Sequence, residues 1–168
     1  MAGRLMRLLF RPGWRLRCID PPLGWVRVSD DVLPVAGIRL QVTTFLTSQW
    51  AGAVTVKELQ LRVMAGEREY VVPWIATADP DGVPLGDTPE YSVGSAAPHH
   101  AFVDFASDAP DLVVLLESAT EAVPVQLEGI FNAGIEFRPI AGLDLTIEQP
   151  LLRGSEWHRV RTGRELTE

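Results

Sequence analysis

The stretch that decides the fold runs from Ile38 to Val63 and reads IRLQVTTFLTSQWAGAVTVKELQLRV. Apolar residues return at every second position from Ile38 to Leu46, and the pattern resumes at Val54. Because successive side chains of a strand point to opposite faces, this two-residue period predicts two strands with one buried face. The chain therefore belongs to the antiparallel all-β class.

The second of these strands changes parity across Lys57 and Glu58, which is typical of a β-bulge. With that bulge included, the parity assigns Gln41 and Gln60 to the solvent face. The residues expected in the core are Leu40, Val42, Val56, Leu59, Leu61 and Leu127.

Short alternating segments separated by turns continue along most of the chain. About nine such strands with little helix predict an antiparallel two-sheet sandwich, immunoglobulin-like in architecture, with a closed β-barrel as the alternative. The run Leu112–Leu116 is apolar at every position, which favours a central strand covered on both faces. The connection Ala65–Arg68 is predicted to be a hairpin turn, and Pro73 indicates an edge or a bend in the strand that follows.

The 168 residues suit one domain with a basic N-terminal arm and a polar tail. We assign residues 1–13 to the arm, 14–150 to a single β-sandwich domain and 151–168 to the C-terminal tail. Within the domain, the two-residue period stops over residues 77–100. A loop of this length is uncommon in a compact domain and is often functional.

Charge is distributed unevenly along the chain. Residues 1–18 hold five arginines and no acid, residues 19–152 carry a net charge of −13, and the whole chain carries −7. An acidic body repels nucleic acid and anionic membranes, so nucleic acid is disfavoured as a partner of the body. We expect the arm to dock on the acidic body of its own or a neighbouring subunit.

A single cysteine, Cys18, excludes an intramolecular disulfide, and no apolar run approaches the 20 or so residues of a membrane-spanning helix. The apolar stretch Leu8–Phe10 is too short for a secretion signal. These features predict a cytoplasmic protein without an integral membrane segment.

Carboxylates gather at Asp79, Asp81 and Asp87 in the 77–100 segment. Clustered carboxylate oxygens are suitable calcium ligands, and this set is the candidate metal site. The stretch Asp79-Pro80-Asp81-Gly82 is also a good β-turn sequence, which is the simpler interpretation. No cofactor is otherwise expected.

Nucleophilic and zinc-dependent chemistry find little support in the sequence. His99 and His100 are neighbours in an extended segment and would point to opposite faces, and a third ligand is not evident. No Gly-x-Ser-x-Gly elbow or phosphate-binding glycine loop occurs. The absence of a familiar catalytic constellation argues against an enzyme.

The sequence therefore favours a non-enzymatic protein-interaction or assembly module, an accessory subunit of a bacterial complex, that binds a protein partner or forms a homo-oligomer. The alternatives are a small metal-dependent or hydrolytic enzyme with its site in residues 77–100, and a basic-arm binder of membrane surface or nucleic acid. Apolar residues of the arm and an isolated tryptophan are the candidate partner-binding residues: Leu5, Leu8, Leu9, Phe10, Trp14 and Trp50.

Overall fold

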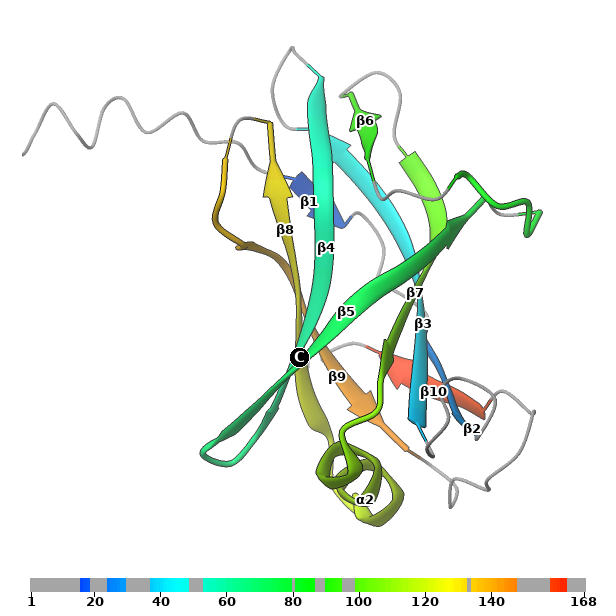
Figure 1. Cartoon of the computed structure of the whole chain (residues 1–168), viewed down its shortest axis with the longest axis vertical. Coiled ribbons are helices and arrows are strands. Elements are labelled where there is room, and N and C mark those ends of the chain that lie inside the picture. The colour runs from blue at the N-terminus through cyan, green and yellow to red at the C-terminus, as the bar shows by residue number, and fades with distance from the viewer. Residues whose placement is uncertain are drawn as a thin grey trace, which may run out of the picture.

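The computed structural model describes residues 16–18, 24–29, 37–48, 53–79, 81–86, 90–94, 99–132, 134–147 and 158–162. Ten strands and one helix occur in these ranges (Figure 1). The strands are β1 (Leu16–Cys18), β2 (Gly24–Ser29), β3 (Gly37–Ser48), β4 (Val54–Ala65), β5 (Arg68–Ala78), β6 (Tyr91–Val93), β7 (His99–Ser107), β8 (Val123–Phe131), β9 (Arg138–Thr146) and β10 (His158–Thr162). The helix is α2 (Pro110–Ser118).

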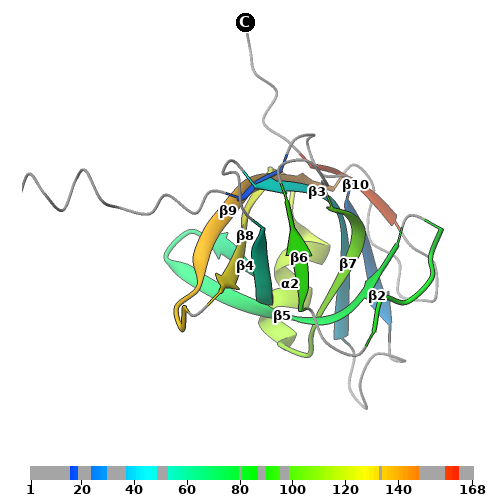
Figure 2. The same ribbon diagram turned by 90° about the horizontal axis from the view of Figure 1, so that it is seen from above.

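All strand pairings are antiparallel and join the strands in one sheet, in the order β1-β3-β2-β10-β9-β8-β4-β5-β7. β6 lies off this path and pairs with the start of β4. β3 also pairs with β7 over nine positions, so the last strand of the order meets the second and the sheet curls around an interior (Figure 2). The predicted antiparallel all-β fold is confirmed. A division into two packed sheets, an immunoglobulin-like arrangement and full closure are not confirmed.

The alternation read from the sequence places the core. Val54, Val56, Leu59, Leu61 and Val63 of β4 are all at most 2% exposed. They pack in one cluster with buried side chains of β2, β3, β5 to β9 and α2. Of the residues expected in the core, Leu40, Val56, Leu59, Leu61 and Leu127 are buried, whereas the side chain of Val42 lies outside the described set.

The predicted bulge and hairpin are confirmed. The β4–β8 register shifts between Val56, which faces Phe131, and Glu58, which faces Ile130. Lys57 is the extra residue, and both Lys57 and Glu58 are exposed. Gly66 has φ of 62° in the two-residue turn between β4 and β5, a conformation that glycine adopts without strain.

Pro73 marks the point at which β5 changes neighbours. From Arg68 to Pro73 the strand pairs with β4, and from Trp74 to Ala78 it pairs with β7. A register shift between Trp74 and Ala76 follows directly, so that Ile75 is an extra residue opposite β7. Proline has no N–H to donate to a ladder, which suits it to this crossing point. The bend predicted at Pro73 stays a prediction.

The interpretation of Leu112–Leu116 as a strand is wrong, because these residues belong to α2. Pro110 occupies the first turn, where no intrahelical N–H is needed, and Asp111 adds a negative charge near the N-terminus. Leu112, Val113 and Leu116 are buried on one helical face, whereas Val114 is 59% exposed. The helix lies at one end of the curled sheet (Figures 1 and 2).

The 77–100 segment is more regular than its sequence suggests. β5 continues to Ala78, which bridges to Pro84, and Leu85 donates its N–H to Thr77 O at 2.9 Å. Tyr91–Val93 forms β6 against Val54–Val56 of β4. The pairing of β6 with β4 joins residues distant in sequence, which is why local periodicity did not reveal it.

Candidate functional site

Asp79 organises the acidic turn through its own side chain. Its Oδ1 accepts the N–H groups of Asp81 at 3.0 Å and Val83 at 2.8 Å. The backbone adds bonds from Gly82 N to Asp79 O and from Asp79 N to Val83 O, each 2.9 Å. Gly82 has φ of 82°, which a side chain would strain. Oδ1 of this carboxylate therefore has a structural role as the acceptor of an Asx-type turn.

The candidate calcium ligands are not brought together in the described part of the chain. Asp81 is exposed in the same turn as Asp79, and Asp87 lies outside the described residues. Within the described ranges, no group of three or more His, Cys, Asp and Glu side chains could hold a metal ion. Calcium binding stays a prediction.

The two histidines open β7 and point to opposite faces, as their adjacency predicts. His99 is half-buried opposite Leu46, whereas His100 is exposed opposite Phe45. Burial, and secondarily the positive charge that His100 can carry, lowers the pKa of His99 below its ordinary value. His158 is placed on β10, opposite Val26.

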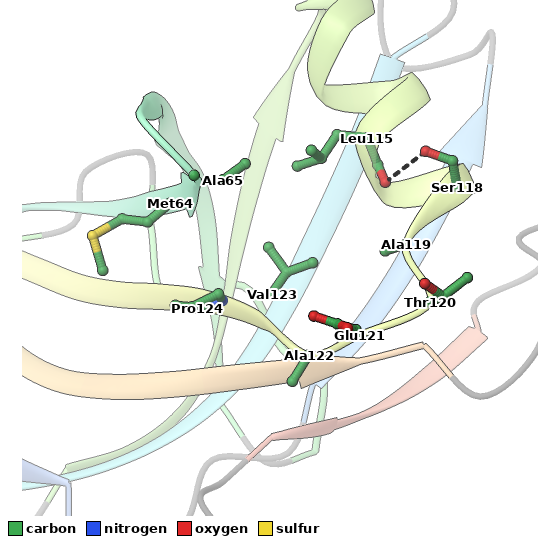
Figure 3. A pocket seen from close by; sticks show the side chains of 11 residues that line it. Met64, Ala65, Leu115, Ser118, Ala119, Thr120, Glu121, Ala122, Val123 and Pro124 are labelled. Carbon is green, nitrogen blue, oxygen red and sulfur yellow. Dashed lines mark hydrogen bonds between the residues drawn. The ribbon is translucent and has the colours of Figure 1, made fainter.

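A pocket of about 360 Å³ opens between the β4–β5 hairpin and the segment that joins α2 to β8 (Figure 3). Leu115 and Val123 supply apolar walls, and Thr120 and Glu121 supply polar groups. The Ser118 hydroxyl is used within the helix, where it donates to Val114 O at 2.7 Å. The pocket has no pair of groups arranged for proton transfer or nucleophilic attack.

The outer face of β8, β4 and β5 carries a hydrogen-bonded cluster, the Glu128 network, made of Gln60, Arg62, Glu69 and Glu128. Arg62 forms a two-pronged ion pair with Glu128, Nε to Oε1 at 2.9 Å and Nη2 to Oε2 at 3.1 Å. Its Nη1 reaches Glu69 Oε2 at 2.8 Å. Gln60 Nε2 donates to Glu128 Oε2 at 2.7 Å.

Register explains how the Glu128 network assembles. Gln60 lies directly opposite Glu128 on β8 and opposite Pro73 on β5, and Arg62 is the next outward residue of β4. Glu128 is only 5% exposed, so three donors replace the water that its carboxylate gives up. Hydrogen bonding to Glu128 and then to Glu69 raises the pKa of Arg62 above its already high value.

The assignment of Gln60 to the solvent face is therefore only half right. Its parity is outward, but the side chain is 8% exposed and bonded to a buried carboxylate. Parity identifies a face and not its neighbours, and the sequence contained no signal that Glu128 would lie opposite.

Beside this network, β5 presents an outward row of apolar residues, the β5 apolar row, made of Val71, Pro73 and Ile75. Val71 is 52% exposed, Ile75 is 41% exposed, and Pro73 is also exposed. Val72 on the opposite face is buried in the core. The strand is thus apolar on both faces although only its inner face is covered by the described residues.

The β5 apolar row was missed by the sequence reasoning, yet a signal existed. A strand that is apolar at both parities is typical of one covered on both sides. That argument was applied to Leu112–Leu116, where the chain is helical, and not to Val71–Ile75, which is a strand with apolar residues at both parities. The candidate partner-binding residues chosen instead (Leu5, Leu8, Leu9, Phe10, Trp14 and Trp50) all lie outside the described residues.

Comparison of the chain with models of known protein families, with curated proteins and with solved structures gives no match. Of the helices in the described residues, none has the length and apolarity to cross a membrane.

Proposed function

We propose that this protein is a non-enzymatic protein-interaction or assembly module, an accessory subunit of a bacterial complex that acts in the cytoplasm. The single observation that carries the proposal is the β5 apolar row. Val71 and Pro73 share the outer face at alternate positions of the strand, and Ile75, the extra residue at the register shift, is exposed next along the chain. Contiguous exposed apolar surface rimmed by polar residues is a feature of protein–protein interaction sites.

The Glu128 network supports the same surface. It forms a rigid polar edge along the row, because Glu128 is held by three donors and Arg62 by two carboxylates. A partner that packs on Val71 and Ile75 would therefore meet ordered side chains and lose little side-chain entropy on binding. An enzyme with its site in residues 77–100 is disfavoured by the structural role of Asp79.

Two exposed valines allow a matched test. Val71→Asp places a charge in the β5 apolar row, and Val114→Asp places the same charge at a similarly exposed position on α2. We expect native mass spectrometry of the tagged protein isolated from its source cells to find bound protein chains with the wild type and with Val114→Asp. Those chains should be lost with Val71→Asp. Equal recovery of the same chains with both variants would contradict the proposal.

A further inference from the structure

The charged groups beside the β5 apolar row indicate what kind of segment could bind to it. The row lies on the same face as two exposed carboxylates, Glu69 at one end of the strip and Glu58 toward the other. Glu69 is two residues from Val71 on β5, and Glu58 is two residues before Gln60, which pairs with Pro73. Arg62 on this face is engaged by Glu69 and Glu128, and Lys57 is exposed beside Glu58. The three carboxylates of Glu58, Glu69 and Glu128 outnumber these two basic groups, so the five groups together carry a net negative charge. An occupant should therefore be apolar with basic side chains at its flanks.

The N-terminal arm (residues 1–13) has this composition. It contains Leu5, Leu8, Leu9 and Phe10 interleaved with Arg4, Arg7 and Arg11, and no acidic residue. Exposed ion pairs alone would contribute only about 0–1 kcal/mol each, so apolar contact must supply most of the affinity. The arm can supply both apolar contact and ion pairing. Its leucine side chains can pack on Val71 and Ile75 while its arginines lie near Glu58 and Glu69.

The position of β1 favours an arm from a second copy. β1 begins at Leu16 and pairs with β3, and it lies at the back of the molecule in Figure 1, whereas β5 crosses the front. The view from above in Figure 2 likewise places β5 on the side away from β3. A fully extended arm of 13 residues spans at most about 45 Å and would have to pass around the body to reach its own row. A neighbouring copy can present its arm directly.

We propose that the β5 apolar row is the docking site for the N-terminal arm of a second copy, with reciprocal exchange of arms in a homodimer. This inference rests on the proposed assembly function and names its partner. Each copy supplies one arm and one row, so exchange of arms covers both rows. A two-fold dimer of this kind is a closed assembly and leaves neither row exposed.

The first measurement is sedimentation equilibrium at matched low salt. We expect the full chain and Val114→Asp to dimerise. Val71→Asp and a chain lacking residues 1–13 should each raise the dimer dissociation constant at least about tenfold, and raised salt should weaken the full-length dimer. Far-UV circular dichroism establishes that both variants are folded. A monomeric full chain, or a dimer that both variants retain, would overturn the inference.

A second measurement separates the two possible sources of the arm. A spin label is attached at Gly3→Cys, outside the apolar residues of the arm, in a Cys18→Ser background. This spin-labelled protein, made without ¹⁵N, is mixed with ¹⁵N-labelled wild type. Broadening of the Val71 and Ile75 amide signals in the labelled copy is the expected result. Broadening only when label and ¹⁵N are in the same molecule would show that each arm folds onto its own body and would overturn the exchange.

These measurements distinguish failure of the arm-docking inference from failure of the proposed function. If the full chain is monomeric but Val71→Asp still loses protein chains in source cells, the arm is the wrong occupant and the interaction module stands. If Val71→Asp changes neither self-association nor the recovered chains, both are wrong.

Discussion

At the scale of single residues, the most informative substitution lies in the Glu128 network. Gln60→Ala removes one of three donors to a carboxylate that is 5% exposed. A hydrogen bond to a charged group contributes about 1.5–3 kcal/mol, and Arg62 Nη2 still donates to the same oxygen, so we expect a loss of stability toward the lower end of that range. Urea unfolding measures it.

The matched control is Glu58→Ala, which truncates an exposed side chain on the same strand. Surface substitutions of this kind cost under about 0.5 kcal/mol. Equal costs for Gln60→Ala and Glu58→Ala would show that Gln60 is solvated, as the sequence pattern alone indicated.

His99 makes the free energy of unfolding depend on pH. Its pKa is lowered in the folded state by burial and then by the charge of His100, so the unfolded chain, with a histidine pKa near 6.5, binds the proton more readily. The stabilisation from neutral His99 is complete above that value and is lost as the pH falls below it. We expect the free energy of unfolding to decrease from pH 7 toward pH 5.

His99→Gln should flatten this pH dependence, since glutamine does not titrate. His100→Gln should reduce it only slightly, because it removes the smaller of the two causes. Unfolding curves at a series of pH values test both. An unchanged slope in His99→Gln would mean that another group titrates in this range.

At the scale of elements, α2 gives the sharpest contrast between sequence pattern and structure. A strand would place Leu112, Val114 and Leu116 on one face, whereas the helix buries Leu112, Val113 and Leu116. Val113→Asp should therefore unfold the protein or sharply lower its melting temperature, because an unpaired charge enters the core. Val114→Asp should leave the melting temperature nearly unchanged. The reverse order would restore the strand interpretation.

The bulge in β4 is a second element with a testable consequence. Deleting Lys57 removes the extra residue opposite β8 and leaves Val56, Glu58 and Leu59 alternating without a register shift. We expect this deletion to be tolerated. Deleting Arg62 instead should unfold the strand pair, because Val63 would move to the outer face.

Arg62→Ala is the control that separates the lost ion pairs from the lost register, and melting temperatures of the three variants give the comparison. A Lys57 deletion as damaging as the Arg62 deletion would show that the bulge itself is required for the twist of β4.

At this scale, the sequence could predict those features that depend on residues close to one another in the chain. Alternation located β3 and β4, and local turn chemistry located Gly66 and the Asp79 turn, because those signals lie within a few residues of one another. The helical state of Leu112–Leu116 could not be read, since a short apolar run fits either a buried helix or a buried strand. β6 depends on a distant partner, the start of β4, that no local pattern encodes.

At the scale of the whole molecule, the candidate site also depends on contacts between residues that are distant in sequence. The apolar residues of β5 on both parities are visible in the sequence, but only the curled sheet shows that Val72 faces the core while Val71 and Ile75 remain exposed. The Glu128 network likewise requires β8 to lie beside β4. The interaction module was predicted from the lack of a familiar catalytic constellation, the long 77–100 segment and the terminal extensions, and it stays a prediction; the exposed β5 apolar row becomes visible only in the arrangement of strands.

The curl of the sheet also makes a prediction about cooperativity. Leu116 of α2 and Leu127 of β8 are both fully buried in one cluster that links the helix to strands from β2 to β9. A shared core of this kind should unfold in one step, since no part can open without exposing the same interior. Leu116→Ala and Leu127→Ala should each cost about 2–5 kcal/mol and should lower the midpoints seen by tryptophan fluorescence and by far-UV circular dichroism together. If Leu116→Ala lowered the midpoint of only one probe, α2 would be an independently melting cap and the core would not be continuous.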